Sequence, residues 1–331
     1  MKEKNENKNE LICFDELEPT KVDWLWFPYI PFGKVTILQG YPGCGKSTFI
    51  LSLAAALSKG LNLPLSEIKH DPCNIVYQNT EDGLEDTVLP RFLLAQGDTH
   101  KLFTINEKER FVTFDDVRIA ETIKATNCKL LVLDPLSAYI GDVNMNVSNK
   151  VRMQFRPLIN VANETGCAIV IIAHLNKSRS ANPMENSSGS GDIIGAVRSA
   201  LVIAQDPDNL EKYYFFQQKN NLAKRGDTLE FKIEDGKIIF VGETDISLEA
   251  FCASHVFVPG RPDERVQDAV EIITEIMGDA PRKPAVLFRT ALEEAGISDG
   301  TITSARKKLG ITSKRMDGHW SWINPKCSIN Q

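Results

Sequence analysis

The chain has 331 residues, of which 42% are hydrophobic and 25% are charged, and its net charge is −6. This size and composition predict one large globular domain followed by a smaller one. The negative charge excludes a protein that coats nucleic acid over its whole surface, although a local basic patch remains compatible with it.

Cysteine usage and terminal composition indicate a cellular compartment. The seven cysteines include no CxxC pair, which argues against a zinc site or a disulfide framework. The first ten residues are mostly Lys, Glu and Asn, without the apolar region of a signal peptide. The apolar runs are too short to span a bilayer. We therefore expect a cytoplasmic protein that has reduced thiols and makes no membrane contact.

Short apolar runs alternate with helix-length segments through the first half of the chain. We predict strands at residues 35–39, 74–78, 129–134 and 168–174, and helices at 46–59, 84–95, 115–125 and 148–164. This alternation is typical of a parallel sheet with crossover helices. Closely spaced strands at 200–205, 213–218, 229–233 and 237–241 predict antiparallel hairpins added to its edge.

The first strand runs into a glycine-rich loop that fits the pattern GxxxxGK[ST]. Such a loop turns its backbone N–H groups around a phosphate, and the helix that follows points its positive end at the same anion. The lysine reaches the β- and γ-phosphates, and the hydroxyl binds Mg²⁺. We therefore predict ATP and Mg²⁺ as cofactors. The predicted nucleotide-binding residues are Gly40, Tyr41, Pro42, Gly43, Cys44, Gly45, Lys46, Ser47 and Thr48.

Two later strands end in carboxylates. The run LLVLD ends at Asp134, which we predict to organise Mg²⁺ together with Ser47. The run NIVYQNTED leads into Glu81, which we predict to polarise the attacking water. Alternatively, acids at this point complement a helix macrodipole, a role that suits Asp82 and Glu85 better than Glu81.

Together these motifs resemble the RecA-like ATPases, and especially the hexameric replicative helicase family of plasmids with its relatives in phages and mobile elements. The resemblance covers residues 22–240 and rests on the ordered set GYPGCGKS, YQNTED, LLVLDPLSAYIG, AIVIIAHLNKS, GSGDIIGAVRSALVIAQD and QQKNN. It implies an α/β P-loop NTPase fold with a mainly parallel central sheet. It also implies assembly into a homo-oligomeric ring such as a hexamer.

The resemblance implies further catalytic residues. His174 matches a sensor of the γ-phosphate, with a structural strand-end histidine as the alternative. Lys177 lies just beyond it and is either a helper of that sensor or a solvated loop charge. Arg198 matches an arginine that some relatives insert into the neighbouring subunit's ATP site, with an intramolecular salt bridge as the alternative. Relatives often carry an arginine near Lys219, which lacks the bidentate fork of a guanidinium group.

The C-terminal segment predicts three helices and a hairpin. Apolar residues at helical spacing are Val266, Val270, Ile273 and Met277, then Val286, Leu287 and Leu292, then Ile302, Ala305 and Leu309. Strands at residues 311–315 and 320–323 flank a turn at Asp317-Gly318. This order predicts a small winged helix.

The third of these helices and the strand after it carry residues suited to DNA. The predicted contacts are Thr301, Ser304, Arg306, Lys307, Lys308, Lys314 and Arg315. The sequence has no acidic residue between Gly300 and Arg315, as is typical of a recognition helix. The alternative is a protein-binding winged helix with a solvated basic face.

These observations define four segments and three functional hypotheses. We predict a disordered tail over residues 1–21, a RecA-like ATPase domain over 22–242, a linker over 243–262 and a DNA-binding winged helix over 263–331. The first hypothesis is a DNA-dependent motor or helicase in replication of a phage, plasmid or mobile element, with DNA, copies of itself and replication proteins as partners. The second is a non-translocating DNA-binding ATPase, such as a helicase loader, recombination mediator or regulator. The third, a small-molecule kinase, leaves Glu81 and the basic C-terminal segment unexplained.

Overall fold

The computed structural model describes residues 13–141, 148–175, 191–254, 264–278, 280–295, 297, 299–316 and 319–324. The chain divides into two compact units, Met1–Phe257 and Val258–Gln331. The predictions for Lys177 and for the turn at Asp317-Gly318 lie outside the described residues.

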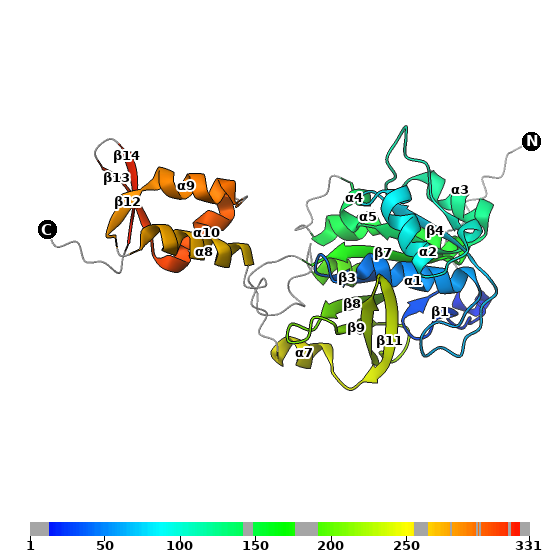
Figure 1. Cartoon of the computed structure of the whole chain (residues 1–331). Helices are drawn as coiled ribbons and strands as arrows, with labels where there is room; N and C mark the ends of the chain where they lie inside the picture. The colour runs from blue at the N-terminus through cyan, green and yellow to red at the C-terminus, as the bar shows by residue number, and fades with distance from the viewer. Residues whose placement is uncertain are drawn as a thin grey trace, which may run out of the picture. The chain divides into compact units, whose positions relative to one another are not determined.

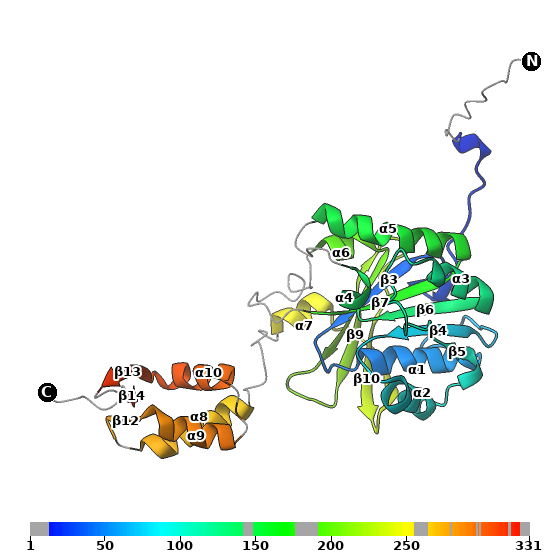
Figure 2. The ribbon, with the colours of Figure 1, turned by 90° about the horizontal axis from the view of Figure 1, so that it is seen from above.

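A nine-stranded sheet forms the centre of the described part of the larger unit (Figures 1 and 2). Its order is β11-β10-β9-β8-β3-β7-β6-β4-β5, with parallel pairing from β8 to β5 and antiparallel pairing from β8 to β11. The strands are β3 (Val35–Gly40), β4 (Asn74–Asn79), β5 (Leu102–Phe103), β6 (Cys128–Asp134), β7 (Ala168–His174), β8 (Ser199–Gln205), β9 (Tyr213–Asn220), β10 (Thr228–Glu234) and β11 (Lys237–Thr244). The predicted α/β fold with antiparallel edge hairpins is confirmed.

Helices cover both faces of this sheet (Figure 2). They are α1 (Lys46–Ser58), α2 (Leu89–Leu94), α3 (Val117–Thr126), α4 (Leu136–Tyr139), α5 (Ser148–Thr165), α6 (Gly191–Ala196) and α7 (Leu248–Ser254). A π-helical turn, Leu84–Val88, leads into α2, so the helix predicted over residues 84–95 has two parts. Among the described residues, no helix has both the length and the apolar character that a bilayer crossing requires.

Shorter elements precede the sheet. The exposed segment 13–23 contains one 3₁₀ turn, Phe14–Glu16. The small hairpin of β1 (Trp24–Trp26) and β2 (Ile30–Pro31) follows, and a 3₁₀ turn, Thr99–Lys101, lies before β5. The described part of the predicted tail, residues 13–21, is therefore solvent-exposed and has little regular structure.

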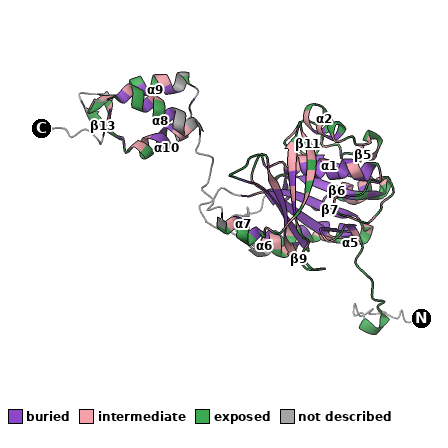
Figure 3. Cartoon of the chain, turned by 60° about the horizontal axis from the view of Figure 1, so that its bottom comes forward, coloured by how far each residue is buried: buried purple, intermediate pink, exposed green. Residues whose placement is uncertain are grey.

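Strand β7 shows why the central sequence runs are continuously apolar. Its side chains alternate between two cores, with Val170 and Ile172 on the face of α1 and Ile169 and Ile171 on the face of α5. Successive side chains of a strand point to opposite faces. Because helices cover both faces, neither set reaches solvent, and β7 is buried from Ala168 to Ala173 (Figure 3).

The linker predicted over residues 243–262 is wrong in its first part. Strand β11 extends to Thr244, and α7 forms within the predicted linker. Phe251 of α7 is 1% exposed and packs against Tyr214 and Phe216 of β9. This apolar contact ties residues 248–254 to the larger unit, whereas residues 255–262 lie outside the described part.

The smaller unit joins three helices to a three-stranded antiparallel sheet, β12-β14-β13. In chain order its elements are α8 (Glu264–Met277), β12 (Arg282–Pro284), α9 (Ala285–Glu294), α10 (Asp299–Leu309), β13 (Thr312–Met316) and β14 (His319–Ile323). Strand β12 is not among the predicted elements.

One helical face of the smaller unit differs from the prediction. Val286 and Leu287 of α9 are 64% and 51% exposed. Leu292 is buried as predicted, but the other core-facing residue is Phe288, whose ring stacks on Trp322 with centroids 4.5 Å apart. A run of three apolar residues left the helical phase ambiguous, and aromatic stacking determines it.

Candidate nucleotide site

Two glycines shape the loop between β3 and α1. Gly43 and Gly45 have φ angles of +79° and +83°, in the left-handed region that disfavours side chains. A Cβ atom on Gly45 would also collide with Ile233 of β10. Helix α1 begins directly afterwards, at Lys46, so its positive end acts at the same loop. This backbone has the form of a phosphate cradle.

Lys46 is held against this loop. Its ammonium group donates to the carbonyl oxygens of Gly40 and Tyr41, at 3.0 and 2.8 Å. The residue is only 4% exposed, and its burial lowers the pKa of the ammonium group, although the charges of Asp134 and Glu81 oppose that shift. The two hydrogen bonds place the Lys46 ammonium group at the loop where nucleotide phosphates would be bound.

Ser47 and Asp134 meet beside Lys46. The Ser47 hydroxyl donates to Oδ2 of Asp134 at 2.7 Å, and the Tyr77 hydroxyl donates to the same oxygen at 2.7 Å. Burial raises the pKa of Asp134, whereas the two hydrogen bonds lower it. The described residues contain no cluster of three or more His, Cys, Asp or Glu side chains suited to a metal. A buried carboxylate beside a hydroxyl nonetheless fits Mg²⁺, which uses few protein ligands and takes others from phosphates.

Glu81 lies on a turn that Asn79 holds. The side-chain oxygen of Asn79 accepts from the backbone N–H groups of Glu81 and Asp82, at 3.0 and 3.3 Å, and its amide donates to the Asp82 carbonyl. The Glu81 carboxylate is 58% exposed and lies 3.6 Å from Nε2 of His174. Asp82 pairs instead with Arg91 at 2.7 Å. The two neighbouring acids therefore have different partners, His174 for Glu81 and Arg91 for Asp82.

The sheet register explains this convergence. Strands β3, β7, β6 and β4 are consecutive neighbours, and their parallel pairing places Gly40 opposite His174 and Asn79 opposite Asp134. Carboxyl ends of parallel strands share one edge, where ligands bind in open α/β sheets. The glycine-rich P-loop, the Asp134 carboxylate and the Glu81–His174 pair therefore lie together.

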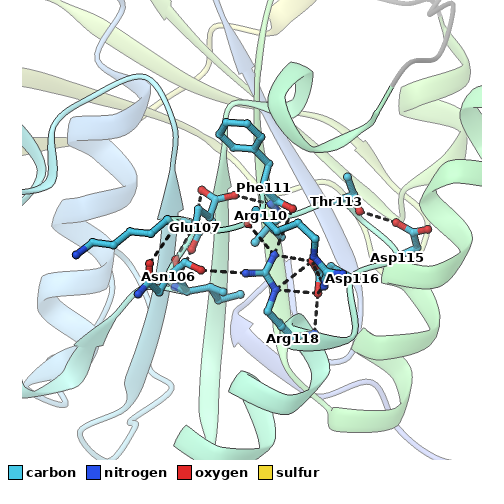
Figure 4. Close-up of polar contacts among 12 residues, drawn as sticks. Asn106, Glu107, Arg110, Phe111, Thr113, Asp115, Asp116 and Arg118 are labelled. Atoms are coloured by element: carbon cyan, nitrogen blue, oxygen red, sulfur yellow. Dashed lines mark hydrogen bonds and ion pairs between the residues drawn. The ribbon is translucent and has the colours of Figure 1, made fainter.

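A polar cluster in the loop after β5 and at the start of α3 is joined by hydrogen bonds to Gln78 of β4 (Figure 4). Gln78 exchanges hydrogen bonds with the backbone of Ile105 and donates to Glu107. Arg118, in the first turn of α3, pairs with Asp116 at 2.7 Å. It also donates to three carbonyl oxygens of the preceding loop, those of Asn106, Arg110 and Phe111. Arg118 thereby fastens the loop that packs against the strand leading to Glu81.

Arg198 and Lys219 lie elsewhere. Arg198 directly precedes β8, and because β8 runs parallel to β3, it lies at the opposite sheet edge from the P-loop. Its side chain is exposed. The Lys219 ammonium group donates to the carbonyl oxygens of Ile194 and Val197, at 2.7 and 2.8 Å, which is the interaction of a helix C-terminal cap for α6. Burial and the charge of Arg198 lower its pKa.

The predicted DNA contacts divide by exposure. Exposed cations are Lys307 and Lys308 of α10 with Lys314 and Arg315 of β13, here named the basic surface. Ser304 is also exposed and Thr301 is half-buried. Arg306 stacks over the Trp322 ring at 4.6 Å and donates to Ser313, so it contributes to packing within the unit.

The fold and this site define a P-loop ATPase with a RecA-like core. The chain belongs to the AAA-domain family, whose sequence profile matches residues 6–180. No curated protein matches it.

Two solved structures are similar in part. One is a KaiC-like protein, PH0186, from the archaeon Pyrococcus horikoshii OT3, at 18% identity and a TM-score of 0.46, covering 64% of this chain and 90% of that one. The other is a DnaB-like replicative helicase, described with its interactions with primase, at 12% identity and a TM-score of 0.49. That match covers 64% of this chain but only 58% of the helicase. At these levels neither structure indicates a substrate or activity for this chain.

Proposed function

We propose that this protein is a DNA-dependent ATPase, acting as a motor or helicase in replication of a phage, plasmid or mobile element. The observation that carries the catalytic part is the convergence of Lys46, Ser47, Asp134 and Glu81 at one sheet edge. The order of motifs, which resembles the hexameric plasmid replicative helicases, supports the biological setting.

Each residue has a distinct role in this proposal. The P-loop and Lys46 bind the phosphates of ATP. Ser47 and Asp134 would hold Mg²⁺, which supplies charge neutralisation at the phosphates when bound. Glu81, exposed and free to meet solvent, accepts a proton from the attacking water. His174 lies 3.6 Å from Glu81 and would act as a sensor, coupling the presence of the γ-phosphate to the position of the Glu81 carboxylate.

DNA binding is assigned to the smaller unit. Its order α8-β12-α9-α10-β13-β14 is that of a winged helix, in which α10 would be the recognition helix and β13-β14 the wing. The basic surface supplies cations for phosphates, while Ser304 and Thr301 offer polar groups for base edges.

Assembly follows from Arg198. An exposed arginine at the sheet edge opposite its own P-loop is unsuited to act in the same subunit. We assign it to the ATP site of a neighbouring copy, which requires a head-to-tail oligomer such as a ring.

The second candidate function is a non-translocating DNA-binding ATPase, such as a loader or mediator. The division of the chain into two compact units is compatible with this second function, because DNA binding by the smaller unit does not by itself require translocation. A forked duplex with one labelled strand distinguishes the two functions. A motor releases the strand in the presence of Mg²⁺ and ATP, and Lys46→Ala abolishes release. A protein that binds the fork without releasing the strand supports the second function.

A further inference from the structure

Tyr77 is a buried polar residue on a parallel strand that lies next to the edge strand β5. It lies on β4, is 2% exposed, and belongs to the core on the α1 side together with Ile75 and Val132. A buried hydroxyl requires a hydrogen-bond partner. Here the partner is Oδ2 of Asp134, at 2.7 Å, on the neighbouring strand β6. The hydroxyl thus reaches out of an apolar layer to the carboxylate of the nucleotide site.

The Asp134 carboxylate is held on one side by two donors. Ser47 and Tyr77 both contact Oδ2, each at 2.7 Å, and neither contacts Oδ1. Hydrogen bonds to a carboxylate are short and strong, and two of them restrict rotation of the group.

We propose that Tyr77 is a positioning residue for Mg²⁺ binding: it fixes Asp134 and, through the shared oxygen, Ser47 in the arrangement that both need. This inference rests on the proposed assignment of Mg²⁺ to Ser47 and Asp134. Partners that orient metal ligands are commonly worth roughly 10- to 100-fold in metal affinity. The role is distinct from that proposed for Glu81, because Tyr77 acts through the Asp134 carboxylate, to which its hydroxyl donates.

The test compares Tyr77→Phe with Tyr139→Phe in the full chain. Tyr139 of α4 is equally buried, at 0% exposed, but its hydroxyl does not hydrogen-bond Asp134. Mn²⁺ replaces Mg²⁺ as the probe, and its affinity for the ADP complex is measured from the electron paramagnetic resonance signal of free Mn²⁺. ADP affinity in EDTA is measured in parallel and reports folding of the P-loop.

We expect Tyr77→Phe to weaken Mn²⁺ binding by about tenfold, near the lower end of the range for such partners, with ADP affinity in EDTA unchanged. Tyr139→Phe should keep the wild-type value. Wild-type Mn²⁺ affinity in Tyr77→Phe would overturn the inference. Asp134→Asn distinguishes failure of this inference from failure of the proposed metal site. If Asp134→Asn also binds Mn²⁺ normally, the assignment of the metal to Asp134 is wrong.

A second variant covers misfolding. If Tyr77→Phe loses ADP binding in EDTA, a fluorinated tyrosine at position 77 keeps the ring and the hydroxyl but makes the hydroxyl a stronger donor. Altered Mn²⁺ affinity in that protein supports the positioning role, and unaltered affinity contradicts it.

Discussion

Replacing Arg198 by alanine tests whether one subunit completes another's active site. The register pairs Thr36 with Ser199 and Gly40 with Ile203. Arg198 therefore lies about five residues from the level of Gly40, or roughly 16 Å along the strand at 3.3 Å per residue. Its guanidinium group does not span this distance to the nucleotide of its own subunit. Any catalytic effect must act on a neighbour.

The expected loss of turnover is that of an arginine acting on the transferring phosphoryl group. An arginine that stabilises the transferring phosphoryl group contributes roughly 10³ to 10⁵ in turnover. We expect Arg198→Ala to lose about a thousandfold in turnover. ATP affinity should be unchanged, because Lys46 and the loop carbonyls that hold it remain intact. Arg225→Ala is the matched control, since that arginine is exposed and pairs with Glu249, away from the P-loop, among the residues that the structure describes.

A mixing assay then locates the arginine. Arg198→Ala and Lys46→Ala are each expected to be inactive alone. Once sizing shows that they co-assemble, a mixture contains interfaces at which an intact P-loop meets an intact Arg198, and part of the activity should return. Wild-type turnover by Arg198→Ala would refute the reasoning. So would co-assembled mixtures that remain inactive although Arg198→Ala still binds ATP.

Three further sets of substitutions have expected outcomes. Glu81→Gln should bind ATP normally in equilibrium titrations yet turn over about 10²- to 10⁴-fold more slowly, the range for a lost general base, and a matching loss of ATP affinity would show a structural role. Arg118→Ala should lower the free energy of unfolding in urea titrations, because the buried Asp116 carboxylate loses its closest charged donor. Arg110→Ala should have the smaller effect, below about 1 kcal/mol, because the Arg110 side chain on the same carboxylate is 67% exposed. Arg118 lowers the pKa of Asp116, so the stability that this ion pair gives the fold is complete above the ordinary carboxyl pKa and is lost as pH falls through the lowered pKa. Arg118→Ala should therefore weaken the acid dependence of the free energy of unfolding. An unchanged dependence of that free energy on pH would contradict the pairing. Changing all four residues of the basic surface to glutamine should reduce the salt slope of duplex binding by about 0.9 per lost phosphate contact, and an unchanged slope would exclude that surface.

The strands β3, β4, β6 and β7 were predictable because they are largely buried on both faces, whereas the short, partly exposed parallel strand β5 was not predicted. The run that became β7 is apolar along its whole length, and its boundaries, Ala168–His174, matched the prediction. Elements that depend on distant contacts were not predictable. Helix α7 is too short to show a clear period, and its position is set by Phe251 packing on β9. Strand β12 has the sequence Arg-Lys-Pro and exists because it pairs with β14.

The candidate site shows the same division. The P-loop spacing is local, so its residues could be identified from sequence without knowledge of the fold. Tyr77 and Asn79 act across strands and turns, and a tyrosine in an apolar strand gives no sign of its partner. The only available signal was a hydroxyl in a strand that ends at a predicted catalytic acid. For Lys219, sequence could not reveal that the ammonium group would cap α6.

The most direct test of the proposed function is the steady-state rate of phosphate release from ATP, measured with and without single-stranded DNA. The protein should hydrolyse ATP only with Mg²⁺, and single-stranded DNA should raise the rate, while Lys46→Ala should be inactive under both conditions. Hydrolysis that single-stranded DNA leaves unchanged would contradict a DNA-dependent motor. Phosphate transfer to a small molecule in place of release would assign the site to a kinase.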